Sequence, residues 1–280
     1  MKIYRTAAEL LAGPGPCVVV PTMGALHEGH AALVRAGARV AAERSISRGC
    51  VVTNFVNPTQ FNEKSDFDRY PRTLDADAAI CEAAGAAAVF APSVEEVYPP
   101  GQTVPAPPLP DVAVRPGLED AHRPGHFAGV CQVVRRLFEL TRPSAAIFGE
   151  KDWQQLQVVR AMTAQENLSI EIVGMPTIRE RTGLAMSSRN VFLGAADRVR
   201  ALAISRALAQ VSRHDDIASA ERSMRDVLAE QGITPEYAVV RDAATLLAPA
   251  SPPSAPRRAL IAARVGPVRL IDNAAWTPAG

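Results

Sequence analysis

Short apolar runs alternate with longer amphipathic segments through roughly the first 175 residues of the chain. A short unbroken apolar run is typical of a buried strand, and apolar positions spaced three and four apart are typical of a helix. The runs that predict strands are residues 17–20, 50–56, 86–91, 145–148 and 170–175. The stretches that predict helices are residues 29–42, 75–84, 130–140 and 153–165. This order predicts an α/β fold, a doubly wound parallel sheet wrapped by helices.

The pattern changes after about residue 177. Two stretches predict long helices at about residues 195–212 and 216–231, and three short apolar runs predict strands at residues 237–241, 259–265 and 268–271. Helices followed by consecutive strands are typical of an α+β arrangement with an antiparallel sheet. We therefore predict two domains, a doubly wound domain of residues 1–177 and a smaller C-terminal α+β domain of residues 178–280.

Composition and charge narrow the class of protein. The chain has 280 residues, 48% of them hydrophobic and 21% charged, as expected of a soluble protein with a real core. Its 30 lysines and arginines nearly balance 29 aspartates and glutamates, so charge gives no reason to expect nucleic acid or an acidic membrane as a partner. No apolar run approaches the roughly 18 residues needed to cross a bilayer, and residues 1–20 lack the features of a secretory signal. The four cysteines are scattered without CxxC spacing, which favours a reducing compartment, and we expect a cytoplasmic protein.

The most informative segment, residues 21–30, follows the first predicted strand and opens the first predicted helix. Free backbone N–H groups and the helix dipole attract phosphate at such a place, and Gly24 and Gly29 let a ligand approach the backbone. His27 and His30 lie on one side of a helical turn, where both can face that anion. An imidazole there can donate to oxygens that gain charge during phosphoryl or adenylyl transfer.

Two other interpretations of this histidine pair stay open. The histidines could merely cap a turn, which is the simpler interpretation of a lone His-x-x-His. They could also bind zinc, although the other histidines and cysteines lack ligand spacing and the usual helical pair is four residues apart. The strand–turn–helix context favours the phosphate site over both.

Amide side chains follow the second predicted strand. Asn57 and Gln60 can donate and accept hydrogen bonds, which suits a small hydroxylated carboxylate. The alternative is ordinary turn chemistry, because Asn-Pro commonly starts a turn.

A third segment, residues 148–155, again leads from a predicted strand into a helix. Gly149 permits backbone approach, Lys151 supplies a positive charge for phosphate, and Asp152 is placed to cap the helix. Gln155 would point into the same crevice from the first helical turn. A lysine at such a turn is more often simply solvated, so this segment indicates a phosphate site only in combination with the other segments.

A fourth segment, residues 184–190, contains Ser187, Ser188 and Arg189 in sequence. Two hydroxyls and a guanidinium can form a phosphate clamp, because arginine presents a planar fork of donors. The alternative is a capping loop with a surface arginine. Three of the four segments follow predicted strands, and ligands of open α/β sheets bind beyond the carboxyl ends of strands. A nucleotide together with a small polar acid is the economical interpretation.

These segments resemble those of the pantothenate synthetase family, within the nucleotidyltransferases that carry a His-x-Gly-His motif. The matching blocks run in family order over nearly the whole chain: residues 21–30, 55–61, 69–73, 123–127, 149–155, 186–190 and 269–273. A lone His-x-Gly-His would indicate only the class, whereas the combination of blocks indicates this family.

The resemblance implies a role for each matched residue. His30 would be the acid that aids pyrophosphate departure, and His27, Lys151 and Arg189 would contact phosphates. The complete implied ATP-binding set is Met23, Gly24, Ala25, Leu26, His27, Glu28, Gly29, His30, Gly149, Glu150, Lys151, Asp152, Ile178, Met186, Ser187, Ser188 and Arg189. Gln60 and Gln155 would hold pantoate, with Asn57 nearby.

The resemblance also implies the reaction. Pantoate would attack the α-phosphorus of ATP, giving pantoyl adenylate and pyrophosphate, and β-alanine would then displace AMP to give pantothenate. The family uses Mg²⁺ with ATP, for which Asp77 is a possible outer-sphere partner, and no metal site built from protein ligands is expected. The family is usually a homodimer, with a Rossmann-like N-terminal domain and a smaller C-terminal lid.

The sequence departs from the family pattern at two positions. The family usually has Ser-Ile-Phe before Val-Asn-Pro, whereas this chain has Thr53-Asn54-Phe55, with a polar side chain where an apolar one is expected. Asp120 replaces a common glycine. Neither change removes a catalytic candidate, although both could alter packing or loop position.

Two rival functions remain. The first is another adenylyltransferase of the same class, acting on a different acid or on a nucleotide. The second is a catalytically silent nucleotide-binding module, which would bind ATP without releasing AMP. An aminoacyl-tRNA synthetase is disfavoured by the neutral charge.

Overall fold

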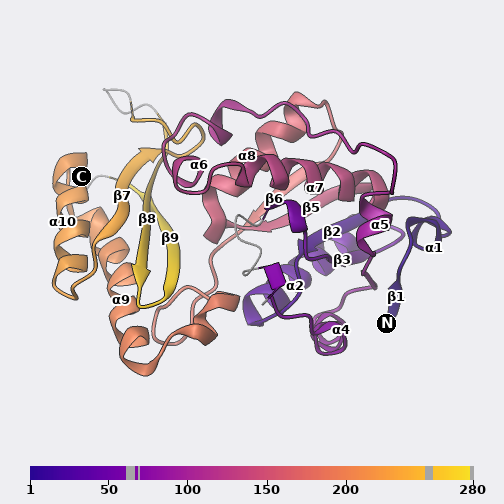
Figure 1. Cartoon of the computed structure of the whole chain (residues 1–280), viewed down its shortest axis with the longest axis horizontal. Helices are drawn as coiled ribbons and strands as arrows, with labels where there is room; N and C mark the ends of the chain where they lie inside the picture. Colours follow the sequence, from indigo (N-terminus) through magenta and orange to yellow (C-terminus); the bar gives the residue numbers. More distant parts are fainter. Residues whose placement is uncertain (61–66, 69, 250–254, 278–280) are drawn as a thin grey trace. The chain divides into compact units, whose positions relative to one another are not determined.

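The computed structural model describes residues 1–60, 67–68, 70–249 and 255–277 (Figure 1). The chain forms two compact units, which we call the first unit (residues 1–150 and 155–176) and the second unit (residues 151–154 and 177–280). Phe61 and Arg69, which belong to the blocks behind the family resemblance, lie outside the described residues.

The first unit contains a six-stranded sheet in the order β1-β4-β3-β2-β5-β6, and every strand pair described in it is parallel. The strands are β1 (Lys2–Tyr4), β2 (Cys17–Thr22), β3 (Cys50–Asn54), β4 (Ala88–Phe90), β5 (Pro143–Gly149) and β6 (Glu171–Met175). From β2 the chain order extends one way through β3 and β4 and the other way through β5 and β6. The predicted doubly wound α/β fold is confirmed, and its switch point lies between β2 and β5.

Helices connect these strands and cover the sheet. They are α1 (Ala7–Leu11), α2 (Glu28–Glu43), α4 (Leu74–Ala83), α5 (Val94–Val97), α6 (Glu119–His122), α7 (His126–Thr141) and α8 (Trp153–Gln165), with short 3₁₀ turns η1 (Pro58–Gln60), η2 (Asp111–Ala113) and η3 (Glu150–Asp152). Helix α7 lies between Gly125 and Arg142, which are both in the left-handed conformation, and the N–H of Arg142 caps the helix by donating to the carbonyl of Phe138 at 2.8 Å.

Alternate strand residues fill the core on the two faces of this sheet. Val18 and Val20 of β2 pack in one cluster with α2 residues such as Val34. The intervening Val19 is also fully buried, as is Ala146 of β5. Because successive side chains of a strand point to opposite faces, both faces are covered, which explains the uninterrupted apolar runs in the sequence.

The second unit contains a three-stranded antiparallel sheet in the order β7-β8-β9. Its elements are η4 (Ser188–Phe192), α9 (Ala195–Gln210), η5 (Val211–Arg213), α10 (Ile217–Ala229), β7 (Pro235–Asp242), β8 (Arg257–Val265) and β9 (Val268–Trp276). Helix α9 contacts β8 and β9, and α10 contacts β7. The predicted α+β arrangement with an antiparallel sheet is confirmed.

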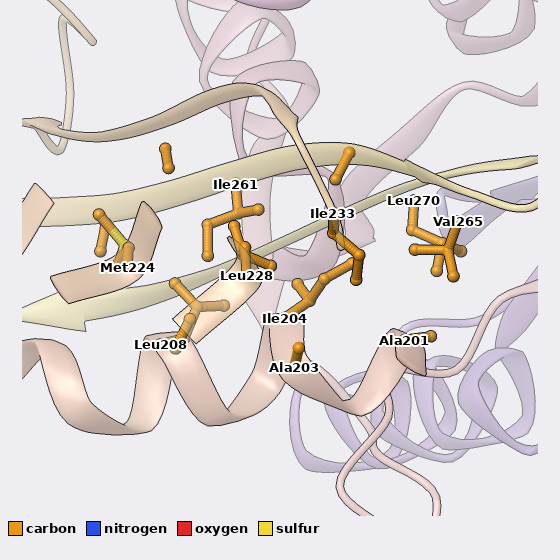
Figure 2. Close-up of a cluster of buried hydrophobic side chains, with 14 of the residues drawn as sticks. Ala201, Ala203, Ile204, Leu208, Met224, Leu228, Ile233, Ile261, Val265 and Leu270 are labelled. Carbon is orange, nitrogen blue, oxygen red and sulfur yellow. The ribbon is translucent and has the colours of Figure 1, made fainter. Parts of the chain in front are cut away.

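The core of the second unit lies between these two helices and the sheet. Ile204 and Leu208 of α9 and Met224 and Leu228 of α10 gather around Ile261 of β8 (Figure 2). Each of these side chains is buried, so the small unit has a core of its own. Within the described residues, no helix is both long and apolar enough to cross a membrane.

The end of the last strand was predicted too early. The apolar pattern ended the last strand at residue 271, but β9 continues to Trp276. Asp272 and Asn273 interrupt the apolar run, yet both are buried and hydrogen-bonded. Burial of satisfied polar groups is invisible to a pattern that counts only apolar positions.

Candidate active site

The loop between β2 and α2 turns sharply at two consecutive residues. Gly24 has φ 83° and Ala25 has φ 52°, both in the left-handed region. The N–H of Ala25 donates to Oδ2 of Asp77 at 3.1 Å, and the N–H of Leu26 donates to Oδ1 of Asp77 at 2.8 Å. A carboxylate on α4 therefore holds the backbone of the predicted phosphate-binding loop.

Asp77 has further donors around it. Nδ2 of Asn54 donates to Oδ2 at 2.8 Å, and the hydroxyl of Thr73 donates to Oδ1 at 3.2 Å. A carboxylate offers about four acceptor positions, so these four donors use them. Asp77 is also only 2% exposed. The suggested outer-sphere role of Asp77 toward Mg²⁺ does not fit this geometry, because its oxygens are occupied by the protein.

His27 and His30 stand at the beginning of α2. The N–H of Gly29 donates to Nδ1 of His27 at 3.1 Å, and the N–H of His27 donates to Nδ1 of His30 at 3.3 Å. The ring centroids are 4.1 Å apart. Because each Nδ1 accepts a hydrogen bond, each neutral ring carries its proton on Nε2.

The capping interpretation and the catalytic interpretation of these histidines are therefore compatible. Capping uses Nδ1 of each ring and satisfies backbone N–H groups at the helix start, whereas donation to a phosphate would use Nε2–H. For the zinc interpretation, the described residues contain no group of three or more His, Cys, Asp or Glu side chains placed to hold a metal ion.

The side chain of Asn57 is buried and hydrogen-bonded within the protein. It is 1% exposed, and its Oδ1 accepts hydrogen bonds from the backbone and hydroxyl of Thr59 and from the hydroxyl of Tyr98, the last at 2.9 Å. Its Nδ2 donates to Oε1 of Gln60 at 3.1 Å and to the carbonyl of Gly129 at 3.3 Å. These contacts let Asn57 orient Gln60, and a direct contact between Asn57 and substrate stays a prediction.

Gln60 joins two of the predicted segments. Its Nε2 donates to the sulfur of Met23 at 3.0 Å, so the end of η1 lies against the loop after β2. Nδ1 of His126 lies 3.3 Å from the carbonyl oxygen of Gln60. A Cβ on Gly129 would lie 2.6 Å from the carbonyl oxygen of Thr59, so α7 packs closely on η1. Sequence reasoning missed Tyr98 and Gly129; for the second, the available signal was a glycine directly before a stretch that predicts a helix.

The segment after β5 spans both units. Gly149 ends β5, and the nearest atoms to a Cβ added there would be those of Leu33 at 3.8 Å, so the protein's own packing does not demand glycine. Gln155 lies half-buried in the first turn of α8 and belongs to the first unit, as does Glu150.

Lys151 and Asp152, in contrast, belong to the second unit. The carbonyl of Lys151 accepts a hydrogen bond from Nδ2 of Asn273 on β9 at 2.8 Å. The indole N–H of Trp153 donates to the carbonyl of Ala243 at 2.8 Å, and the guanidinium of Arg258 lies 3.7 Å from the centre of the Trp153 ring. Nζ of Lys151 is 3.8 Å from the carboxylate of Asp152. The sheet of the second unit therefore fixes the backbone that carries Lys151.

The predicted clamp residues lie in a separate loop of the second unit. Ser187 precedes η4, and its hydroxyl accepts a hydrogen bond from the N–H of Arg189 at 3.2 Å. Ser188 begins η4. The carbonyl of Ile178 accepts from the N–H of Met186 at 2.9 Å, which brings these two predicted nucleotide contacts together. Ser187 therefore caps η4, as the capping alternative suggested. The phosphate contacts of Ser187, Ser188 and Arg189 stay predictions.

Asn190 and Arg179 stabilise the same loop. Nδ2 of Asn190 donates to Glu180 and to the carbonyl of Ala185, both at 3.0 Å. Arg179 binds the buried carboxylate of Asp272 through two hydrogen bonds of 2.6 and 3.1 Å. This loop is anchored to β9, as is the backbone of Lys151.

The fold and the strand–turn–helix geometry together define a doubly wound α/β protein whose strand–turn–helix of β2 and α2 lies at the switch point of its sheet, a place that favours phosphate. Comparison with known proteins narrows this class. The family model described as pantoate–β-alanine ligase matches residues 3–275. The chain belongs to the pantoate–β-alanine ligase family, as the resemblance predicted.

Individual relatives agree with this assignment. A pantothenate synthetase of Rhizorhabdus wittichii is 46% identical over 284 residues, which cover 99% of this chain and 96% of the relative. The crystal structure of pantothenate synthetase from Thermus thermophilus superposes with a TM-score of 0.88 at 42% identity, covering 98% of this chain and 99% of that one. A pantoate–β-alanine ligase from Francisella tularensis, solved in complex with β-γ ATP and β-alanine, gives a TM-score of 0.78 at 30% identity, covering 98% of this chain and 97% of that one.

Proposed function

We propose that this protein condenses pantoate with β-alanine at the expense of ATP, forming pantothenate through a pantoyl-adenylate intermediate and releasing AMP and pyrophosphate. Family membership and the relative solved with ATP and β-alanine support the choice of substrates. The observation that carries the proposal within this chain is the pair of histidines at the start of α2, both with Nδ1 occupied by backbone donors.

In the first step, a carboxylate oxygen of pantoate attacks the α-phosphorus of ATP and the bond to pyrophosphate breaks. The helix N-terminus and the Nε2–H groups of His27 and His30 would stabilise the charge that develops on the departing oxygens. Lys151, Ser188 and Arg189 would supply further donors to the phosphates. Mg²⁺ would enter as the partner of ATP, because this ion binds mainly through phosphate oxygens and water and needs no cage of protein carboxylates.

In the second step, the amine of β-alanine attacks the activated carbonyl, AMP leaves, and the amine loses a proton. Gln60 and Gln155 would hold the pantoate portion, with Gln60 oriented by Asn57 and Met23. Binding of this kind aligns the reactants without a covalent protein intermediate, so positioning supplies much of the rate.

We also propose the wider organisation that the sequence indicated. Residues 1–177, apart from residues 151–154 that belong to the second unit, would form the nucleotide- and pantoate-binding domain. Residues 178–280 would act as a lid, and the protein would be a cytoplasmic homodimer. The separate core of the second unit supports a lid that moves as one body. The cysteines are buried free thiols, which suits a reducing compartment. Sedimentation velocity of the purified protein tests the dimer.

The principal experiment measures AMP formation from ATP, pantoate and β-alanine, with each substrate omitted in turn. His30→Ala and Lys151→Ala are expected to lose nearly all activity, whereas the matched controls His214→Ala and Lys2→Ala should retain it. Pantoate-dependent exchange of pyrophosphate into ATP, in the absence of β-alanine, tests the adenylate. Wild-type-like rates in His30→Ala or Lys151→Ala would remove that residue from the mechanism.

The same assays separate the rival functions. Exchange that depends on nicotinate mononucleotide or on an amino acid, and not on pantoate, would indicate another adenylyltransferase. ATP binding without AMP release under all conditions would indicate a silent nucleotide-binding module.

A further inference from the structure

The loop after β2 is held in a conformation that its own residues disfavour. Ala25 has φ 52°, and a residue with a Cβ in the left-handed region is disfavoured by about 1–2 kcal/mol. Gly24 precedes it with φ 83°. Glycine adopts this conformation freely, so it is Ala25 whose conformation requires compensating contacts.

The compensation comes from Asp77 and Asn54 acting together. The carboxylate of Asp77 accepts the N–H groups of Ala25 and Leu26, which turns both donors inward. Asn54, the last residue of β3, donates from Nδ2 to the same Oδ2 that accepts from Ala25. A buried carboxylate is stable only when its oxygens are satisfied, so the Asn54 donor supports the acceptor that shapes the loop.

Asn54 also lies directly against the turn. A Cβ on Gly24 would lie 2.7 Å from Oδ1 of Asn54 and 3.0 Å from Oδ2 of Asp77. The loop therefore packs on the Asn54 amide, and only glycine fits at residue 24. An apolar residue, which the family resemblance leads one to expect at this position, could fill the space but could not donate to Asp77.

We propose that Asn54 is a positioning residue for the nucleotide, acting through Asp77 to fix the loop of residues 23–26 and the start of α2. The inference rests on the proposed function, because it concerns how ATP is presented to pantoate. Asn54 would then act on the adenylation step alone. The β-alanine step depends on other groups and should be little affected.

The first test is a kinetic comparison of Asn54→Ile with the wild-type protein. Loss of the donor should lower kcat/KM for ATP in pantoate-dependent pyrophosphate exchange by about 10-fold, since small misplacements of reacting groups have large effects on rate. The KM for β-alanine should stay within about 2-fold, because only the adenylation step uses the loop. Equal effects on both substrates, or none on ATP, would overturn the proposal.

A second variant keeps the size of the side chain and changes only its chemistry. Asn54→Asp places two carboxylates together, so one must take up a proton before an O–H can donate to Asp77. Activity relative to wild type should therefore be low at pH 8 and rise on acidification toward pH 6. Cys81, whose thiol pKa burial and Asp77 raise to about 12, stays neutral in this range, and His27 and His30 beyond the loop are the same in both proteins, so the ratio of the two activities cancels the histidine contribution. A flat ratio between the two proteins would contradict the proposed donor role.

Amide exchange gives a readout that does not depend on activity. The Ala25 and Leu26 N–H groups should exchange faster in Asn54→Ile than in the wild-type protein, while peptides from the second unit keep their exchange rates. Wild-type protein that forms no AMP would defeat the proposed function, whereas unchanged exchange in this loop would defeat the positioning role. The two failures are thereby distinguished.

Discussion

Gly129→Ala adds one methyl group where α7 touches η1. The new Cβ would lie 2.6 Å from the carbonyl oxygen and 2.8 Å from the carbonyl carbon of Thr59, and 3.0 Å from Cα of Gln60. All three atoms belong to the backbone, so no side chain can rotate away. The turn that carries Gln60 must move instead.

The size of this movement follows from the contact distances. Ordinary van der Waals contact begins near 3.4 Å, so the Thr59 carbonyl must retreat by about 0.8 Å. Overpacking of this kind costs about 1–3 kcal/mol, whereas replacing glycine by alanine within a helix returns about 1 kcal/mol. The free energy of unfolding should therefore fall by only about 0–2 kcal/mol, because the two effects partly cancel. The displacement of Gln60 should raise the KM for pantoate and lower kcat/KM by about 10- to 100-fold.

Urea unfolding and steady-state kinetics, measured on the same preparation, separate these effects. Gly13→Ala is the matched control, because a Cβ there meets only the Arg48 side chain at 3.8 Å. The control should leave both measurements unchanged. A pantoate KM equal to that of the wild-type protein would refute the reasoning, since it would mean that η1 accepts the methyl group without moving Gln60.

Three further predictions concern other parts of the chain. Burial raises the pKa of the Cys131 thiol to about 12, and the other cysteines are raised to about 11 or 12. Because an unfolded thiol ionises near pH 9, the unfolding free energy should be unaffected below pH 9 and fall above it, by about 1.4 kcal/mol per thiol at pH 10. In Cys131→Ala, the fall in unfolding free energy between pH 8 and pH 10, measured with urea, should be smaller by this amount. Asp272→Ala leaves Arg179 without its carboxylate and should lower the unfolding free energy by about 3 kcal/mol, a loss that a wild-type urea midpoint would exclude. Tyr98→Phe removes one donor to Asn57 and should lower stability by about 1 kcal/mol and raise the pantoate KM a few-fold, with the ATP KM unchanged.

The elements that the sequence predicted well are those whose stability is local or whose burial is complete. Helix α8 was predicted at residues 153–165 and occupies Trp153–Gln165, and the five predicted strands of the parallel sheet overlap β2, β3, β4, β5 and β6. The short β1, with the sequence Lys-Ile-Tyr, was missed because its strand character comes from pairing with β4, more than 80 residues away. Pairing at that distance leaves no periodic signal in three residues.

In the candidate site, too, features formed by residues close in sequence were predictable, and features formed by distant residues were not. The His-x-Gly-His turn was visible because its function depends on a strand, a turn and a helix that adjoin in sequence. The role of Asn57 was not visible, since an amide that binds a ligand and one that braces Gln60 have the same residue type. Asn54 was noticed as unusual, but it ends strand β3 while its partner Asp77 lies on helix α4, and only the fold brings the two together.

Residues 151–154 belong to the second unit, although the residues on either side of them in the sequence belong to the first. The chain passes to the second unit for good only after residue 176. Trp153 and Lys151 remain fastened to that unit through Ala243 and Asn273 even though they precede the main linker by more than 20 residues. A polypeptide split at the linker would thus leave part of the second unit attached to the N-terminal fragment. The C-terminal fragment alone would lack the contacts that Lys151 and Trp153 make with Asn273 and Ala243, so residue 176 is a poor place to divide the gene.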